Sequence, residues 1–219
     1  MWPFSRRPAP RILADRIVSL GGLCEVAYQA RRIGRSETAY PFDWWITPLA
    51  RVAPVLEAGA AAQFAAADLE KLADYGGKRA LYSRRAGTIH LHEFPAGEDF
   101  LALDVAEISA RLVPKYEALD SRLRAACASG TTLFVRQRLS DHDPEGADLE
   151  EDLDRLWSAL RLLAADPRLL LLDYPPVRPR AGQITAAVPR FRDQAIVCRT
   201  VGRGGRIDDL LVTNYPRRR

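Results

Sequence analysis

Cys24 is the residue of this sequence whose position best suits chemistry. A short apolar run over residues 16–20 predicts a buried strand, and Gly21-Gly22 ends it. Apolar residues at helical spacing follow and stop at Gly34, so Cys24 is expected in the first turn of a helix. Unpaired backbone N–H groups and the positive end of the helix dipole favour a thiolate there, which would make Cys24 a nucleophile. The other interpretation is that Cys24 packs as a small buried hydrophobic side chain.

The turn before Cys24 could also bind an anion. Ser19, Gly21 and Gly22 come at the carboxyl end of the predicted strand, where ligands bind in open α/β sheets. Backbone amides in such a turn can hold an oxyanion or a phosphate. The G-x-G-x-x-G spacing and the Walker pattern are both absent from the sequence. Arg136, at the end of a strand predicted over 131–136, could bind the anion or form a salt bridge.

Residues 40–45 place four aromatic side chains and a proline in an irregular connection. Exposure of so much apolar surface is unfavourable, so Phe42, Trp44 and Trp45 are expected to fold back and wall a cleft. Asp43 would then be partly buried and would need a partner such as an arginine or an imidazole. Alternatively, Asp43 caps a helix or accepts hydrogen bonds from backbone amides.

His92 is expected at the end of the second strand of a hairpin, and Glu93 follows it directly. An imidazole in that position could act as a general base, with a carboxylate to orient it. A structural role for this histidine is the alternative.

The remaining elements are predicted from hydrophobic periodicity and from the glycines and prolines that end helices and strands. They are helices over about 48–58, 61–74 and 103–128 and after Asp143-Pro144, and strands over 80–83, 88–92, 131–136 and 169–173, with two more within 195–212. Alternation of helices with wholly apolar strands favours a mostly parallel central sheet with helices on both faces. We therefore expect a Rossmann-like three-layer α/β fold with an added hairpin. One domain would span residues 11–214, between a disordered lead-in over 1–10 and a basic tail over 215–219.

Composition narrows the class of protein. The 219 residues are 47% hydrophobic and 27% charged, which is typical of a globular chain. No apolar run reaches the length of a membrane span, and the N-terminus lacks the pattern of a signal peptide, so a cytoplasmic location is expected. Three cysteines and three histidines without metal-ligand spacing predict neither a disulfide scaffold nor a metal site, and no cofactor is expected.

The net charge of +4 does not favour nucleic-acid binding. The three terminal residues 217–219, all arginines, supply much of the excess of basic over acidic residues. Only three of the 32 basic residues are lysines. No nucleic-acid recognition motif accompanies the charge.

Four sequence blocks occur in a characteristic order. They are Ser19-Leu20-Gly21-Gly22-Leu23-Cys24 with Ala27, Tyr40-Pro41-Phe42-Asp43-Trp44, His92-Glu93-Phe94 and Leu133-Phe134-Val135-Arg136. Together they resemble a bacterial family labelled "putative papain-like cysteine peptidase", over roughly residues 16–140. The resemblance implies that Cys24 is the nucleophile and His92 its base, in the order that papain-like enzymes use. Unlike papain, the chain has no glutamine just upstream of Cys24 to donate to an oxyanion.

These observations predict a cytoplasmic thiol hydrolase, either a peptidase or an acyltransferase, that acts on a small molecule or a peptide. Cys24 would attack, His92 would accept and return the proton, and Asp43 or Glu93 would orient the imidazole. Backbone amides near Gly22 would hold the oxyanion. The alternative function is a non-peptidase α/β protein that binds a nucleotide or sugar-nucleotide at the Gly21-Gly22 turn.

Overall fold

The structure is a computed structural model. It describes residues 14–22, 24–34, 37–95, 97–139, 141–175, 177–181, 183–186, 194–201 and 207–214. The lead-in and the basic tail expected from the sequence lie outside these residues.

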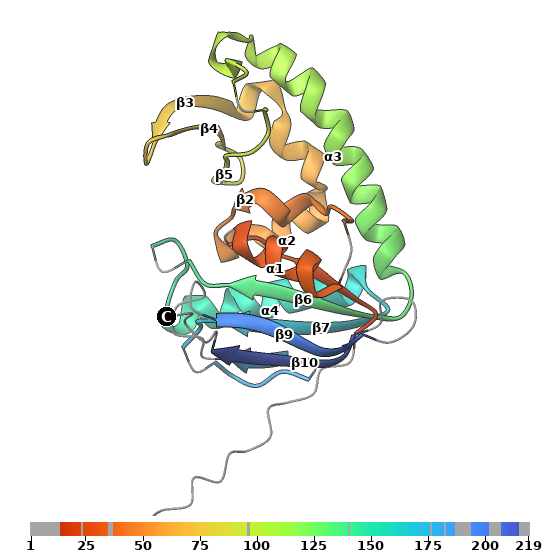
Figure 1. The fold of residues 1–219 in the computed structure, drawn as a ribbon. Coiled ribbons are helices and arrows are strands. Elements are labelled where there is room, and N and C mark those ends of the chain that lie inside the picture. Colours follow the sequence, from red (N-terminus) through yellow and green to blue (C-terminus); the bar gives the residue numbers. More distant parts are fainter. Residues whose placement is uncertain are drawn as a thin grey trace, which may run out of the picture.

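A four-stranded parallel sheet contains the strand that precedes Cys24 (Figure 1). Its strands, in spatial order, are β1 (Arg16–Ser19), β6 (Thr131–Gln137), β7 (Asp166–Leu172) and β8 (Gln183–Ala186). The last four residues of β7, all leucines, are fully buried, because protein covers both faces of this strand. The strands predicted from apolar runs at 16–20, 131–136 and 169–173 are confirmed, with small shifts at their ends.

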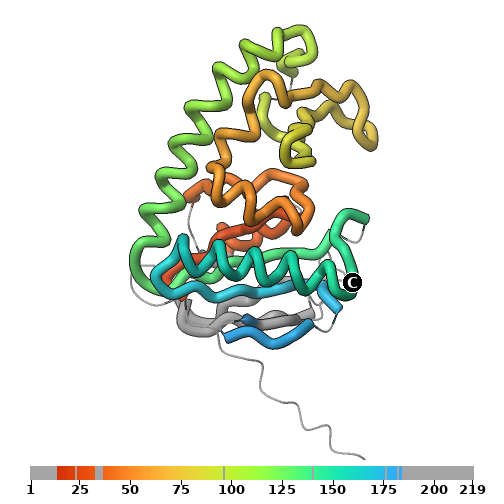
Figure 2. The backbone as a smooth tube through the Cα atoms, turned by 180° about the vertical axis from the view of Figure 1, so that it is seen from behind, coloured from red at the N-terminus to blue at the C-terminus, as the bar shows by residue number. Residues whose placement is uncertain are grey.

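Four α-helices accompany the strands in the described part of the chain. They are α1 (Cys24–Gly34), α2 (Leu49–Ala58), α3 (Val105–Cys127) and α4 (Gly146–Leu163). The helix predicted after Asp143-Pro144 is α4; it buries Leu149, Leu153, Leu156 and Leu160 and contacts both α2 and β7. Figure 2 shows α4 lying along the strands of the parallel sheet, and both views show α3 running from the parallel sheet to the opposite end of the molecule.

A second sheet of four antiparallel strands replaces the single hairpin expected from the sequence. Its strands, in spatial order, are β2 (Trp45–Ile46), β5 (Thr88–His90), β4 (Lys78–Ser83) and β3 (Leu69–Tyr75). The helix predicted over 61–74 is wrong: this segment holds the short 3₁₀ helices η2 (Ala60–Phe64) and η3 (Ala66–Asp68) and most of β3. Gly76 and Gly77 adopt positive φ angles of 58° and 80°, and the hairpin turn that they form pairs β3 with β4.

The remaining strands β9 (Gln194–Val201) and β10 (Ile207–Asn214) form the antiparallel pair predicted near the end of the chain. Two further 3₁₀ helices, η1 (Pro41–Trp44) and η4 (Phe100–Ala102), lie in the connections. The chain is therefore a mixed α/β protein with a parallel sheet and an antiparallel sheet of four strands each.

One cluster of buried side chains joins the two sheets. It contains Val18 and Phe134 from the parallel sheet, Trp45 and Leu81 from the antiparallel sheet, and Phe64 from η2. No helix among the described residues is long and apolar enough to cross a membrane.

Candidate functional site

The turn between β1 and α1 presents Cys24 as the first residue of its helix, with an exposed side chain. The backbone N–H of Gly21 donates to Ser19 Oγ at 3.2 Å, which tightens the turn. Gly21 and Gly22 have positive φ angles of 75° and 96°, and a Cβ atom on Gly22 would lie 2.6 Å from the Gln137 carbonyl oxygen. This close approach to β6 requires glycine, so the Gly-Gly pair fixes how α1 leaves the sheet.

Strand β2 lies between the segments that carry Cys24 and His92. A Cβ atom on Gly21 would lie 3.3 Å from the Trp45 carbonyl oxygen, so the turn adjoins β2 on one side. On the other side, Trp45 pairs with His90 in β5, and His92 follows two residues later. The fold thus brings two segments about 70 residues apart to the two sides of one short strand.

His92 lies beyond β5, which ends at His90, and its side chain is exposed. Its ring packs edge-on against Trp44, with 5.8 Å between the ring centroids. The Arg31 guanidinium lies over the same indole, 5.0 Å from its centroid. Trp44 is therefore the contact that joins His92 to α1.

Asp43 is buried beside Trp44 and is paired with Arg31 of α1. Asp43 Oδ2 accepts from an Arg31 guanidinium nitrogen at 2.8 Å and from the Tyr40 backbone N–H at 3.0 Å. Burial raises the pKa of Asp43, although the Tyr40 N–H group and Arg31 act in the opposite direction. The partner of this carboxylate is the arginine, and Asp43 also caps η1 as one of the sequence interpretations proposed.

The other aromatic residues of this segment do not wall a cleft as expected. Phe42 and Trp45 are 1% and 0% exposed, and they pack against each other in the core at 5.3 Å between ring centroids. The Trp45 indole N–H donates to Tyr116 Oη at 2.8 Å, which satisfies its buried donor. Only Trp44, which is partly exposed, faces the surface.

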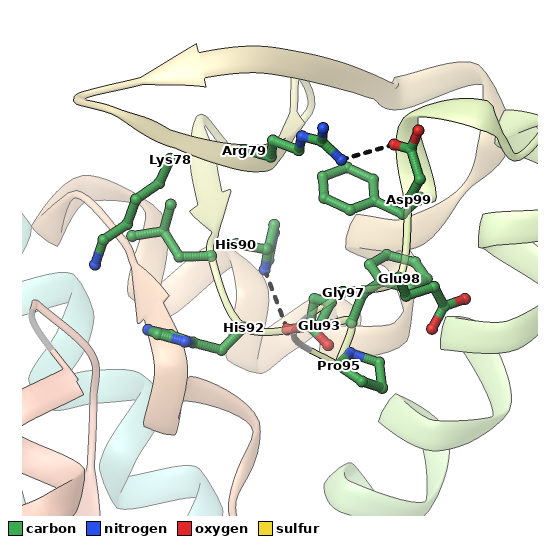
Figure 3. A pocket seen from close by; sticks show the side chains of 12 residues that line it. Lys78, Arg79, His90, His92, Glu93, Pro95, Gly97, Glu98 and Asp99 are labelled. Carbon is green, nitrogen blue, oxygen red and sulfur yellow. Dashed lines mark hydrogen bonds and ion pairs between the residues drawn. The ribbon is translucent and has the colours of Figure 1, made fainter.

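Glu93 is directed at His90 and not at His92 (Figure 3). Its carboxylate accepts from Tyr116 Oη at 2.5 Å and from Lys115 Nζ at 2.6 Å, and it lies 3.9 Å from His90 Nδ1. Figure 3 shows the His92 side chain pointing away from this group. Glu93 therefore fixes the loop that follows β5.

His90 is fully buried, and its Nε2 lies 2.9 Å from Thr88 Oγ1. Burial lowers the pKa of His90 to about 4; the nearby Glu93 opposes this shift and Lys115 adds to it. A cavity of about 740 Å³ adjoins this loop, with both histidines, Glu93 and Lys78 among its lining residues. His90 is thus a neutral structural histidine at pH 7, whereas His92 is open to solvent.

Arg136 is fully buried and is already paired within the protein. One guanidinium nitrogen donates to both carboxylate oxygens of Asp143 at 2.9 and 3.0 Å. Another donates to the Leu20 carbonyl oxygen at 3.2 Å, and Nε donates to Tyr174 Oη at 3.2 Å. This arrangement matches the salt-bridge interpretation. It differs from anion binding, because no part of the side chain reaches solvent.

Ser19, Gly21, Gly22 and Cys24 form one turn. Arg31 pairs with Asp43 and lies over Trp44, and the Trp44 indole packs against His92. Phe42 and Trp45 lie in the core, and Glu93 and Arg136 belong to two separate buried networks. Among the hydrogen bonds of the described residues, none joins Cys24 to His92, or His92 to Asp43 or Glu93. A direct Cys24–His92 pair stays a prediction. In the same part of the chain, no group of three or more histidine, cysteine, aspartate or glutamate side chains could hold a metal ion.

Sequence reasoning missed Arg31 and Gln137 as neighbours of the site. Arg31 lies seven residues after Cys24, which places both on one face of α1, two turns or about 10 Å apart. This seven-residue spacing is visible in the sequence and could have indicated that Arg31 lies on the same helix face as Cys24. Gln137 contacts Gly22 from a distant strand, and no local signal could have indicated this contact.

A family model described as "Putative papain-like cysteine peptidase" matches residues 15–149. The match runs from just before β1 into the first turn of α4 and includes Cys24, Asp43, His92 and Arg136. No curated protein and no solved structure matches the chain. Because the family model covers more than half of the 219 residues, the chain belongs to the family described as putative papain-like cysteine peptidases.

Proposed function

We propose that the chain is a cysteine hydrolase of the papain-like type, a peptidase or an acyltransferase, with Cys24 as nucleophile and His92 as its base. The observation that carries this proposal is the exposed thiol of Cys24 at the first residue of α1, after a turn that requires glycine. Backbone N–H groups at a helix start have no partner within the helix and attract negative charge. Membership of the family supports the same chemistry.

The proposed reaction proceeds through a covalent acyl-enzyme. His92 takes the thiol proton, and Cys24 Sγ attacks the substrate carbonyl carbon, so that its oxygen becomes an oxyanion next to backbone amides of the turn. The carbonyl double bond re-forms as the bond to the leaving group breaks, and His92 returns its proton to that group. Water, or an acceptor amine in an acyltransferase, then attacks the thioester and releases Cys24.

In this proposal, Asp43 is a positioning residue that acts through two neighbours. Asp43 holds Arg31 by an ion pair, Arg31 lies over the Trp44 indole, and the indole packs against the His92 ring. An imidazole held in this way samples fewer orientations when a substrate approaches. Glu93 contributes by fixing the loop that carries His92.

Alkylation of the native protein tests the nucleophile. At pH 7 iodoacetamide should modify Cys24 at least about tenfold faster than Cys127, because only exposed thiolates react quickly and Cys127 is fully buried with a pKa raised by burial. Peptide mapping by mass spectrometry measures the two rates. Equal or slower modification of Cys24 would contradict its role.

A peptidyl electrophile tests the base, because its reaction resembles the acylation step. His92→Ala should slow labelling of Cys24 by roughly a hundredfold, the usual contribution of a general base. His142→Ala is the matched control, since His142 is also exposed, and it should change the rate less than about twofold. If both variants react like the wild type, His92 is not the base.

A further inference from the structure

The hydroxyl group of Tyr116, on α3, joins two segments of the candidate site. Tyr116 is 1% exposed, and its Oη accepts from the Trp45 indole N–H at 2.8 Å and donates to Glu93 Oε1 at 2.5 Å. An indole nitrogen can only donate and a carboxylate can only accept, so the direction of both hydrogen bonds is fixed. A side chain without a hydroxyl at this position would leave both partners unsatisfied.

Each of the two partners directly follows a residue whose ring belongs to the site. Trp45 follows Trp44, and Glu93 follows His92. The Trp44 and His92 rings pack edge-on, with 5.8 Å between their centroids. One hydroxyl group is thus bonded to the next residue along the chain from each ring of this contact.

Strand pairing does not extend to the loop that carries His92. The ladders of β5 with β2 and with β4 both end at His90, and residues 91–94 are bends. Beyond the ladders, Glu93 binds the loop to α3, because its second carboxylate oxygen accepts from Lys115 Nζ at 2.6 Å. The Glu93 side chain is 2% exposed, so water competes little for these hydrogen bonds.

The Tyr116 ring is itself fixed in the core. It stacks on Phe64 with 4.2 Å between centroids and lies tilted against Trp45 at 5.0 Å. Burial and the neighbouring Glu93 raise the pKa of Tyr116 well above its ordinary value of 10, so the hydroxyl keeps the proton that it donates. Tyr116 is therefore a fixed attachment point on α3 for both segments.

The orientation of the His92 imidazole depends on these segments, because neither candidate carboxylate is bonded to it. Asp43 is paired with Arg31, and Glu93 faces His90 while the His92 side chain points away (Figure 3). The course of its loop and the contact with Trp44 are what hold the ring.

We propose that Tyr116 is a positioning residue of the hydrolase: it holds the His92 loop and the Trp44 segment together, so that the imidazole keeps the orientation needed for proton transfer. The effect on catalysis rests on the proposed role of His92 as base; the effect on the position of the His92 ring does not. A loop released from Tyr116 would let the imidazole sample unproductive orientations, and small misplacements of a catalytic group cost large factors in rate.

A double-mutant cycle separates positioning from a general loss of structure. Tyr116→Phe should slow labelling of Cys24 by a peptidyl electrophile about tenfold, part of the loss expected for His92→Ala. In the His92→Ala background, the same change should alter the rate less than about twofold, because no base remains to be positioned. Glu93→Gln keeps an acceptor for the hydroxyl and should react within about threefold of the wild type.

Leu123→Val is the matched control for lost packing. Leu123 is buried on the same face of α3, seven residues or about 10 Å beyond Tyr116. This variant should label within about twofold of the wild-type rate. Equal slowing by Tyr116→Phe and Leu123→Val, or equal slowing by Tyr116→Phe with and without His92, shows a purely structural role and overturns the proposal.

The NMR signal of His92 Cε1–H reports the position of the ring without any chemistry at Cys24. The Trp44 indole shifts this signal, so Trp44→Ala gives the value expected when the contact is lost. Tyr116→Phe should move the signal toward that value, and an unchanged signal overturns the role of Tyr116. A moved signal, with His92→Ala labelled as fast as the wild type, overturns His92 as the base but not Tyr116 as the residue that positions its ring.

Discussion

His90 and His92 are two residues apart and lie in opposite environments. His90 is the last residue of β5 and packs between Trp45 and Phe64, with ring centroids 4.7 and 4.8 Å away. His92 lies beyond the strand, where the chain bends toward the surface. Their positions at the end of one short strand therefore leave His92 exposed and keep His90 buried and neutral.

Acid should destabilise the protein through His90. Its pKa of about 4 in the folded state lies below the ordinary value of 6.5, so the unfolded chain takes up the proton first. The stability that His90 contributes is complete above about pH 6.5 and is lost as the pH falls toward 4. Between pH 7 and 5 the loss in the free energy of unfolding should be about 2 kcal/mol, measured by urea denaturation.

His90→Gln should flatten this pH dependence by a similar amount, since glutamine does not titrate. The groups that face His90, Glu93 and Lys115, remain in this variant. Leu162→Gln is the control and should keep the wild-type slope, because Leu162 is 89% exposed and does not titrate. An unchanged slope in His90→Gln would show that His90 is not the buried group that takes up the proton.

Local signals were sufficient for some residues of the candidate site. The Gly-Gly turn and the helical spacing placed Cys24 at the start of α1, and the spacing of Arg31 from Cys24 was visible in the sequence. A salt bridge was one of the two interpretations of Arg136, but its partner Asp143, like the partner Tyr116 of Glu93, could not be predicted, because both partners come from other elements. Tertiary pairing, not residue type, decides what a charged side chain binds.

At the scale of elements, the segment 60–75 shows how tertiary contacts override local propensity. Its alanines favour a helix, yet η2 is followed by η3 and then by β3. Asp120 of α3 accepts from the Ala60 backbone N–H at 2.6 Å, and Phe64 stacks on Tyr116 with 4.2 Å between centroids. Contacts with α3 hold the start of this segment, and pairing with β4 holds its end. Helix propensity could reveal neither the contacts with α3 nor the pairing with β4.

The β1–α1 turn should not tolerate even a small side chain in place of the hydrogen of Gly22. Gly22→Ala combines a positive φ of 96° with a Cβ atom 2.6 Å from a backbone oxygen of β6, so strand and helix must separate. We expect a loss of about 3 kcal/mol in the free energy of unfolding, from backbone strain and overpacking together. Denaturant titration with far-UV circular dichroism measures it.

Gly76→Ala provides the matched control for this turn. Gly76 also has a positive φ, 58°, but nothing lies within 4 Å of the position of its Cβ atom. Only the strain of the left-handed conformation remains, about 1 kcal/mol. Equal losses for the two variants would mean that the contact between Gly22 and Gln137 does not constrain the turn.

At the scale of the whole molecule, the two sheets share one apolar core, and α3 runs from the parallel sheet to the opposite end of the molecule. Hydrophobic periodicity predicted the strand–helix units of the parallel sheet, because each unit is local. The order β2-β5-β4-β3 was not predicted, because β2 has two residues and its partner lies more than 40 residues away. Hydrophobic periodicity cannot detect a strand of only two residues.

Asp143 accepts hydrogen bonds from several different parts of the fold. It accepts from the Leu49 N–H at the start of α2, from the Leu139 N–H after β6, and from Tyr174 Oη after β7. Its ion pair with Arg136 extends the link to the end of β1, where Arg136 donates to the Leu20 carbonyl. One carboxylate therefore holds together the loops at the carboxyl edge of the parallel sheet.

Asp143→Asn should therefore destabilise the whole chain, because it removes the counter-ion of a buried arginine and turns an amide donor toward groups that donate. The loss in the free energy of unfolding should be about 3–5 kcal/mol, as for other broken buried ion pairs. Asp99→Asn breaks an ion pair whose partners are 52% and 61% exposed, and it should cost less than about 1 kcal/mol. Adding Arg136→Met to Asp143→Asn should recover part of the loss, since the unpaired charge is then gone. Urea denaturation of the four proteins measures these differences. If Asp143→Asn costs no more than Asp99→Asn, the buried network does not hold the carboxyl edge of the sheet together.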